Sequence, residues 1–232
     1  MAQKKLRRFE EINGFPNVLQ YPEQAAGKWH SFFKNEQPVI LELACGKGEY
    51  TLGLANLHPT KNFIGVDIKG NRIWVGAKAA LEQRLENAAF LRTDILGIDN
   101  YFSTNEVDEI WITFPDPQLR LSKAKKRLTH PRFLNLYKNI LKPQGIIHLK
   151  TDSPQLYKFT KEVISYYGLQ LINDIDNVHQ RSNLADELKI KTHYESLDIA
   201  ESNTIFYVSF MLPEDFVAEE KSFSDYLKLN EA

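Results

Sequence analysis

Three acidic residues lie at or near the ends of three apolar runs, where they could bind a nucleoside. They are Glu42, Asp67 and Asp94. Because an ionised carboxylate only accepts hydrogen bonds, Asp67 is suited to the two hydroxyls of a ribose and Asp94 to the exocyclic amine of adenine. A single aspartate at such a position more often caps a helix or a turn. Three acids after three successive runs favour a nucleoside site instead.

A glycine turn follows the first of these runs. It contains Gly46 and Gly48, separated by one residue. Glycine lets the backbone approach a ligand closely, and the N–H groups of such a turn can meet a carboxylate. The spacing is not the G-x-G-x-x-G of dinucleotide sites. Taken alone, the turn is equally typical of an ordinary tight connection between a strand and a helix.

The charged residues are unevenly distributed, although the formal net charge is only −1. Residues 120–132 carry six lysines and arginines and no acid. A second basic group opens the chain, with Lys4, Lys5, Arg7 and Arg8. A basic run is often only a solvated surface. Two such clusters on a nearly neutral chain fit a face that binds phosphates somewhat better.

Composition limits the class of protein. The chain has 232 residues, of which 43% are hydrophobic and 25% charged, which suits a single domain spanning residues 1–232. No apolar run approaches the roughly 18 residues of a membrane helix, and the N-terminus lacks the apolar stretch of a secretory signal. We therefore expect a cytoplasmic protein that does not contact a membrane. Cys45 is the only cysteine and no histidine has a partner at metal-ligand spacing, so we expect neither a disulfide nor a metal site.

A parallel sheet would bring the acids and the glycine turn together. Apolar runs predict strands at 39–43, 63–67, 88–92, 107–112, 146–151, 169–172 and 204–211. Helical patterns occur at 50–55, 71–84, 131–141 and 154–167. This alternation predicts an α/β fold, with a mostly parallel seven-stranded sheet, helices on both faces and ligands beyond the carboxyl ends of the strands. The remaining parts are a basic N-terminal segment (1–20), a polar loop region with a short helix (176–203) and a tail without an assigned role (213–232).

The glycine turn and the acids resemble those of class I methyltransferases, a Rossmann-like superfamily that uses S-adenosylmethionine. The resemblance implies that Gly46 and Gly48 lie under the methionine part of this cofactor and that Asp67 binds its ribose. Ala44 stands where many members carry the first glycine. The full set of cofactor contacts that the resemblance implies is Glu42, Gly46, Gly48, Asp67, Asp94 and Asp116.

Motifs in the second half resemble a more specific family, the bacterial tRNA (guanine-N7)-methyltransferases. The resemblance covers Lys5 to Met211 and implies transfer of a methyl group to N7 of guanine at position 46, in the variable loop of tRNA, which forms 7-methylguanosine. The motifs that carry it are Phe15-Pro16-Asn17-Val18, Phe114-Pro115-Asp116-Pro117 with the basic segment that follows, Lys150-Thr151-Asp152 and Thr192-His193-Tyr194-Glu195.

This second resemblance also implies roles for individual residues. Asp116 would be the catalytic residue. Substrate-binding residues would be Arg120, Asp152, Thr192, His193, Tyr194 and Glu195, and RNA contacts would be Lys123, Lys125, Lys126 and Arg127. The chain departs from the family pattern at Gln118, where a tryptophan is usual, at Arg120, where a lysine is usual, and at 122–124, where Ser-Lys-Ala replaces R-H-N. Because a guanidinium is not equivalent to an ammonium point charge, these departures affect the expected RNA contacts more than the reaction.

The chemistry of the implied reaction suits these residues. Guanine N7 already carries a lone pair, so its attack on a sulfonium methyl needs in-line geometry and a dry cleft rather than a strong base. Asp116 can accept hydrogen bonds from N1–H and the N2 amine of guanine, and its charge stabilises the purine as it becomes positive. Alone, such an aspartate would be read as a turn cap.

Two alternatives remain open on the sequence alone. One is a methyltransferase that acts on another RNA base, such as an adenine amine. The other is an RNA-binding protein of the same fold without activity. The sequence also leaves open whether the protein is a monomer or a homodimer.

Overall fold

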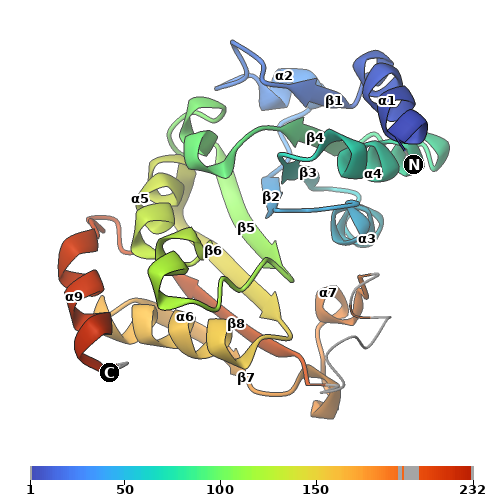
Figure 1. Ribbon diagram of the computed structural model, residues 1–232. Coiled ribbons are helices and arrows are strands. Elements are labelled where there is room, and N and C mark those ends of the chain that lie inside the picture. The colour runs from blue at the N-terminus through green and yellow to red at the C-terminus, as the bar shows by residue number, and fades with distance from the viewer. Residues whose placement is uncertain (1, 193–194, 196–203, 231–232) are drawn as a thin grey trace.

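A computed structural model of the chain describes residues 2–192, 195 and 204–230 (Figure 1). Its centre is an eight-stranded sheet with the order β1-β4-β3-β2-β5-β6-β8-β7. The strands are β1 (Val18–Gln20), β2 (Val39–Leu43), β3 (Asn62–Asp67), β4 (Ala88–Arg92), β5 (Val107–Thr113), β6 (Leu141–Thr151), β7 (Gln170–Ile175) and β8 (Phe206–Met211).

The sheet is mostly parallel, as the sequence predicts. Only β8 runs antiparallel, and it pairs with β6 and β7. The prediction of seven strands is wrong by one, because β1 adds to the edge of the sheet through parallel pairing of Val18 with Phe90 in β4. Its three half-buried residues show no apolar run that would mark a strand. All seven predicted strands are present, although β6 begins earlier than expected, at Leu141.

Helices cover both faces of the sheet, which confirms the second part of the prediction. One face packs against helices through Tyr50, Ile73 and Leu188, and the other through Trp29 and Phe133. The α-helices are α1 (Ala2–Glu11), α2 (Trp29–Phe33), α3 (Glu49–Leu57), α4 (Gly70–Glu82), α5 (Pro131–Ile140), α6 (Pro154–Tyr166), α7 (Asp186–Lys189) and α9 (Glu220–Asn230). Short 3-10 helices are η1 (Ile12–Gly14), η2 (Ile95–Asn100), η3 (Leu121–Lys126) and η4 (Val178–Gln180).

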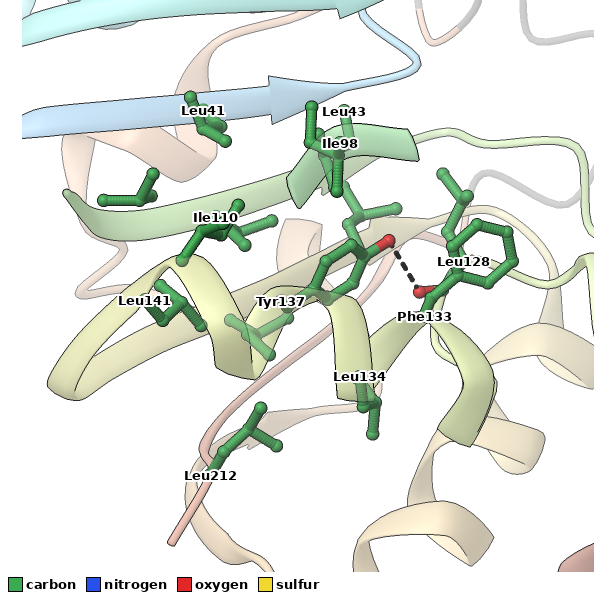
Figure 2. Packing of buried hydrophobic residues seen from close by; sticks show 14 of the residues in the cluster. Leu41, Leu43, Ile98, Ile110, Leu128, Phe133, Leu134, Tyr137, Leu141 and Leu212 are labelled. Atoms are coloured by element: carbon green, nitrogen blue, oxygen red, sulfur yellow. Dashed lines mark hydrogen bonds between the residues drawn. The ribbon is translucent and has the colours of Figure 1, made fainter. Parts of the chain in front are cut away.

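Helix α5 ties the basic segment to the core. Proline is suited to the first helical position, and Pro131 occupies it, while the His130 ring caps the helix by accepting from the Arg132 N–H at 3.1 Å. Figure 2 shows the packing beneath this helix, where the Tyr137 hydroxyl donates to the Leu128 carbonyl at 3.0 Å. The end of the basic segment is thereby fixed against the sheet.

The C-terminal tail packs against the rest of the protein. Helix α9 buries Phe223 and Leu227, and Phe223 contacts the rings of Tyr166 and Tyr167 at the end of α6. The Asn135 side chain adds two hydrogen bonds to the backbone of Ala218, just before the helix. A part of the sequence without an assigned role therefore covers the apolar surface of α5 and α6.

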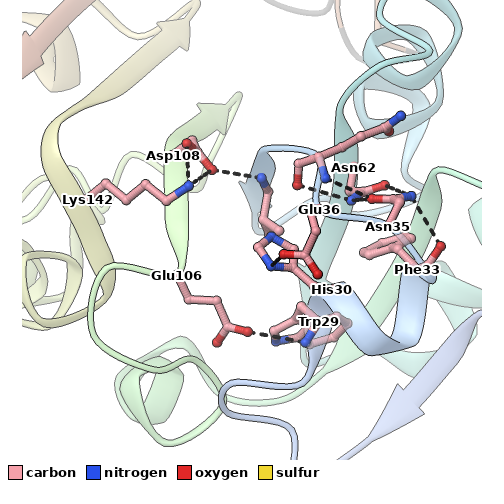
Figure 3. Close-up of polar contacts among 11 residues, drawn as sticks. Trp29, His30, Phe33, Asn35, Glu36, Asn62, Glu106, Asp108 and Lys142 are labelled. Atoms are coloured by element: carbon pink, nitrogen blue, oxygen red, sulfur yellow. Dashed lines mark hydrogen bonds and ion pairs between the residues drawn. The ribbon is translucent and has the colours of Figure 1, made fainter.

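Polar contacts connect the amino ends of the central strands. Asp108, near the start of β5, accepts from the Lys142 ammonium at 2.8 Å and from the Val39 N–H at 2.9 Å (Figure 3). These amino ends of the strands lie opposite the carboxyl ends, where the predicted site residues fall.

In the part of the chain that the structure describes, no helix has the length and apolar character needed to cross a membrane.

Candidate active site

The buried carboxylate of Asp67 joins the ends of two neighbouring strands. Its Oδ2 accepts from the Gly46 N–H at 2.9 Å, and its Oδ1 accepts from the Lys69 N–H at 2.8 Å. Because β2 and β3 are adjacent and parallel, the turn after β2 lies beside the end of β3. Each oxygen still has a second lone pair that can receive a hydrogen bond from a ligand.

A cavity of about 330 Å³ begins at Asp67. Asp94 lies on its wall and also caps η2, because its Oδ1 accepts from the Leu96 N–H at 3.0 Å. Asp94 is exposed, so its second oxygen is accessible. The other residues that line this first cavity are mostly apolar, with three cations: Ala44, Ile68, Thr93, Ile95, Leu96, Lys125, Lys126, Leu128, Arg132 and Phe133.

The glycine turn needs a backbone conformation that suits glycine. Gly46 has φ +58° and Gly48 has φ +72°, both in the left-handed region. A Cβ on Gly48 would lie 2.5 Å from Cε1 of Phe90, so only glycine fits there. A Cβ on Gly46 would have no atom within 4 Å. Ala44 adopts φ +58° without being glycine, which is the uncommon geometry that functional turns often retain.

A second, smaller cavity shares Ala44 with the first and lies over the glycine turn. Glu42 is buried at this cavity and accepts hydrogen bonds from Thr113 Oγ1 at 2.6 Å, from the Thr51 N–H at 2.7 Å and from Thr51 Oγ1. Burial raises the pKa of Glu42 to about 7, although these hydrogen bonds act in the opposite direction. The other lining residues are Cys45, Gly46, Lys47, Glu49, Tyr50, Arg72, Phe114 and Thr192.

The proline-rich turn after β5 carries Asp116. Its first residue, Phe114, has φ +46° and is held by a hydrogen bond from its N–H to the Lys150 carbonyl at 2.8 Å. Asp116 is exposed, and its Oδ1 accepts from the Gln118 N–H at 3.0 Å. The aspartate therefore shapes the turn with one oxygen and presents the rest of its carboxylate to solvent.

The basic segment divides into exposed and buried cations. Lys123, Lys125 and Lys126 are exposed on η3. Arg127 is only 4% exposed, and its guanidinium donates to the carbonyls of Gln118 at 3.2 Å and Leu119 at 3.3 Å. It also lies over the ring of Phe159, 4.4 Å from the centroid. In this structure the Arg127 side chain therefore holds the loop from inside, and its predicted RNA contact stays a prediction.

The remaining predicted substrate residues fall in different environments. Arg120 and Asp152 are exposed. Thr192 is buried on the wall of the second cavity, and its Oγ1 accepts from the Glu195 N–H at 3.3 Å. His193 and Tyr194 lie outside the described residues.

Glu195 faces Lys150 instead of an open surface. Its side chain is 3% exposed, and its Oε2 accepts from the Lys150 ammonium at 2.9 Å. A direct hydrogen bond from guanine to Glu195 stays a prediction, because the side chain is almost completely buried. Sequence reasoning missed Lys150 itself, although a lysine inside the apolar run 146–151 is an unusual residue for a buried strand.

The described residues contain no group of three or more histidine, cysteine or acidic side chains arranged to hold a metal ion.

The polar groups at the carboxyl ends of the strands are suited to a nucleoside with a charged extension. Asp67 and Asp94 can accept hydrogen bonds from the hydroxyls and the amine of such a ligand. The turn from Ala44 to Gly48 leaves room for the ligand beside the backbone.

Comparison with known proteins gives a consistent result. The signature of a family described as "Putative methyltransferase" matches residues 36–208. A tRNA (guanine-N(7)-)-methyltransferase of Bacteroides thetaiotaomicron is 44% identical over 229 residues, which cover 95% of this chain and 90% of that protein. The protein of the same name from Porphyromonas gingivalis is 49% identical over 212 residues, with 86% of each chain covered. The one from Christiangramia forsetii is 45% identical and covers 91% of this chain and 99% of that protein.

Solved structures share the fold at low sequence identity. The 16S rRNA methyltransferase KamB superposes with a TM-score of 0.62 at 13% identity, covering 85% of this chain and 99% of that one. A 30S ribosomal A1408 methyltransferase from an uncultured bacterium gives a TM-score of 0.58 at 17% identity, covering 83% and 97%. These similarities establish the Rossmann-like methyltransferase fold.

Proposed function

Because the chain belongs to the tRNA (guanine-N7)-methyltransferase family, we propose that it transfers a methyl group from S-adenosylmethionine to N7 of a guanine in tRNA. We further propose that this guanine is the one at position 46, in the variable loop, and that the reaction takes place in the cytoplasm, where tRNA is found. The observation that carries the proposal is the pair of cavities that share Ala44, with Asp67 on the wall of one and Glu42 on the wall of the other.

The first cavity fits the adenosine part of the cofactor. Asp67 would accept from the ribose hydroxyls and Asp94 from the adenine amine, while Ile95, Leu96 and Phe133 would contact the faces of the base. The left-handed turn supports the neighbouring placement of the methionine part, because Gly46 lines the second cavity and a Cβ there would project into space that this part needs.

The second cavity fits the methionine part, which carries an ammonium and a carboxylate. Its wall contains charged groups of both signs, with Glu42 and Glu49 on one hand and Lys47 and Arg72 on the other. Such groups can form charge-assisted hydrogen bonds with both ends of an amino acid. S-adenosylmethionine, when bound, supplies an electrophilic methyl group on a positively charged sulfur.

The residues of this chain then need to orient guanine and stabilise charge. N7 attacks with its own lone pair, so no residue has to remove a proton from it. Asp116 would accept from N1–H and the N2 amine of guanine, which orients the base, and its negative charge would stabilise the developing purinium. The exposed cations Arg120, Lys123, Lys125 and Lys126 would attract the phosphates of the tRNA.

The proposal is tested by incubating the protein with unmodified tRNA transcripts and labelled S-adenosylmethionine. Digestion to nucleosides and mass analysis should identify 7-methylguanosine, and a transcript with adenine at position 46 should receive no label. A methylated adenine would show that the base is wrong, and label on the altered transcript would show that the position is wrong. Absence of both labelling and cofactor binding would indicate an inactive RNA-binding protein.

A further inference from the structure

Lys150, at the carboxyl end of β6, uses its side chain to hold a distant segment. The side chain is 0% exposed, and its ammonium donates to the Leu188 carbonyl at 3.0 Å, the Ile190 carbonyl at 2.8 Å and Glu195 Oε2 at 2.9 Å. An ammonium has three donors, so these contacts satisfy it completely. A buried charge that is fully paired fixes the position of the groups around it, because losing any one of them costs desolvation energy.

The backbone of the same residue holds the turn that carries Asp116. Lys150 pairs in register with Thr113, the last residue of β5, and its carbonyl accepts from the Phe114 N–H at 2.8 Å. Phe114 adopts φ +46°, a conformation that costs energy in a residue other than glycine and persists only where the surroundings enforce it. The Lys150 ammonium lies 5.5 Å from the centre of the Phe114 ring, so backbone and side chain both contact this residue.

The segment held by the ammonium reaches the second cavity through Thr192. The Glu195 N–H donates to Thr192 Oγ1 at 3.3 Å, and Thr192 and Phe114 both line that cavity. A shift of Glu195 would therefore displace Thr192 on the cavity wall. Lys150 itself does not line either cavity.

We propose that Lys150 is a positioning residue that fixes the Asp116 turn and residues 188–192 and 195 relative to each other, so that the wall of the second cavity beside this turn is assembled before tRNA binds. The proposal rests on the proposed function for the identity of the substrate. It predicts that loss of the Lys150 ammonium impairs guanine positioning and methyl transfer, and that it also weakens cofactor binding through Phe114 and Thr192 on the wall of the second cavity.

The test compares three variants with the wild-type protein. Lys150→Met keeps the length of the side chain but leaves the buried Glu195 carboxylate without the ammonium, while the His179 ring stays 3.7 Å from its other oxygen. The double variant Lys150→Met with Glu195→Gln removes the charge of that carboxylate. Lys142→Met is the matched control. Lys142 lies at the amino end of the same strand, opposite Lys150, and pairs with Asp108 at 2.8 Å (Figure 3).

Steady-state kinetics with tRNA, calorimetric titration of S-adenosylmethionine and thermal unfolding provide the readouts. In Lys150→Met we expect kcat/KM for tRNA to fall at least about 30-fold. The cofactor Kd should rise as well, because Phe114 and Thr192 line the second cavity. The double variant should recover most of the lost Tm without recovering kcat/KM. Lys142→Met should keep kcat/KM within about twofold.

Hydrogen exchange supplies a readout that does not depend on activity. In Lys150→Met, peptides covering 113–119 and 186–192 should exchange faster together, because the same side chain holds both. The proposal is overturned if kcat/KM is retained, if it recovers along with Tm in the double variant, or if only one peptide changes. A different methylated product in the wild-type protein would instead contradict the proposed function, because the ratio of variant to wild-type rates is measured on whichever product forms.

Discussion

Asp67 Oδ2 accepts a hydrogen bond from the Gly46 N–H at 2.9 Å, so the acid that ends β3 also fixes the glycine turn after β2. Its other oxygen accepts from the Lys69 N–H at 2.8 Å, at the start of α4. The group assigned to the ribose hydroxyls is therefore held on both sides by the backbone before any ligand binds. Such preorganisation lowers the cost of ordering the site on binding.

Replacing Asp67 should weaken cofactor binding. In Asp67→Ala the two charge-assisted hydrogen bonds proposed to the ribose would disappear, and the glycine turn would lose the hydrogen bond from Gly46. Because each such bond contributes about 1.5–3 kcal/mol, we expect the Kd for S-adenosylmethionine to rise at least about tenfold by calorimetry. Asp225→Ala on α9 is the control, since Asp225 only pairs with Lys228 at the surface. Equal affinities of the two variants would remove Asp67 from the site.

The two glycines of the turn should respond differently to alanine. Gly48→Ala should lower the free energy of unfolding by about 2 kcal/mol or more, because its Cβ meets Phe90 at 2.5 Å and its φ is +72°. Gly46→Ala meets no atom and should cost only about 1 kcal/mol, but its methyl group should weaken cofactor binding. Urea unfolding and calorimetry check both effects, with Gly14→Ala as the control because Gly14 has open space and no positive φ. Equal stability losses at the two positions would contradict the packing around Gly48.

Glu42 should make stability depend on pH. Burial raises its pKa to about 7 from an ordinary value of 4.5, so between these two values the folded state binds more protons than the unfolded state. The contribution of Glu42 to stability is then present below about pH 4.5 and is lost as the pH rises to about 7, by up to about 3 kcal/mol. Urea unfolding of wild type and Glu42→Gln across this range isolates the effect, because other titrating groups are shared.

The wild-type protein should therefore lose stability relative to Glu42→Gln as the pH rises. A constant difference, or one that changes in the opposite direction, would show that the hydrogen bonds from Thr51 and Thr113 keep the carboxylate ionised.

The exposed lysines of η3 should determine how tRNA binding depends on salt. Each phosphate contact releases counterions, so Lys125→Ala with Lys126→Ala should reduce the slope of log affinity against log salt by up to about 1.5 units. Binding is measured by filter retention between low and moderate salt. A double replacement of Lys221 and Lys228 on α9 is the control, because it removes the same charge elsewhere. If both double variants keep the wild-type slope, η3 does not contact the tRNA backbone.

Asp116 should affect methyl transfer more than cofactor binding. Asp116→Asn keeps the size of the side chain but turns one acceptor into a donor, which would face the donors of guanine in the proposed complex. We expect the single-turnover rate to fall at least about 100-fold at saturating tRNA, with little change in cofactor affinity. Asp99→Asn on η2, which contacts Asn139, is the control. Transfer at the wild-type rate would leave Asp116 with only its turn contact to Gln118.

The sequence by itself determined the central strands and the starts of two helices. Continuous apolar runs between turn residues require burial on both faces, and the run 88–92 matches β4 at both ends. Pro131 and Pro154 mark the first residues of α5 and α6, because proline fits the first turn and cannot continue an existing helix. The short strand β1 could not be found this way, since only pairing with β4 makes its three residues a strand.

The sequence also determined at which end of the strands the candidate site lies, because the carboxyl ends of parallel strands lie side by side. Only the tertiary structure decided what each charged side chain does there. Arg127 and Lys126 are adjacent and carry the same positive charge, yet Arg127 is buried and holds a loop while Lys126 is exposed. Lys150 reaches acceptors 38 to 45 residues further along the chain. The charge of a side chain is fixed by its type, but its burial and its partners depend on packing between segments that are remote in sequence.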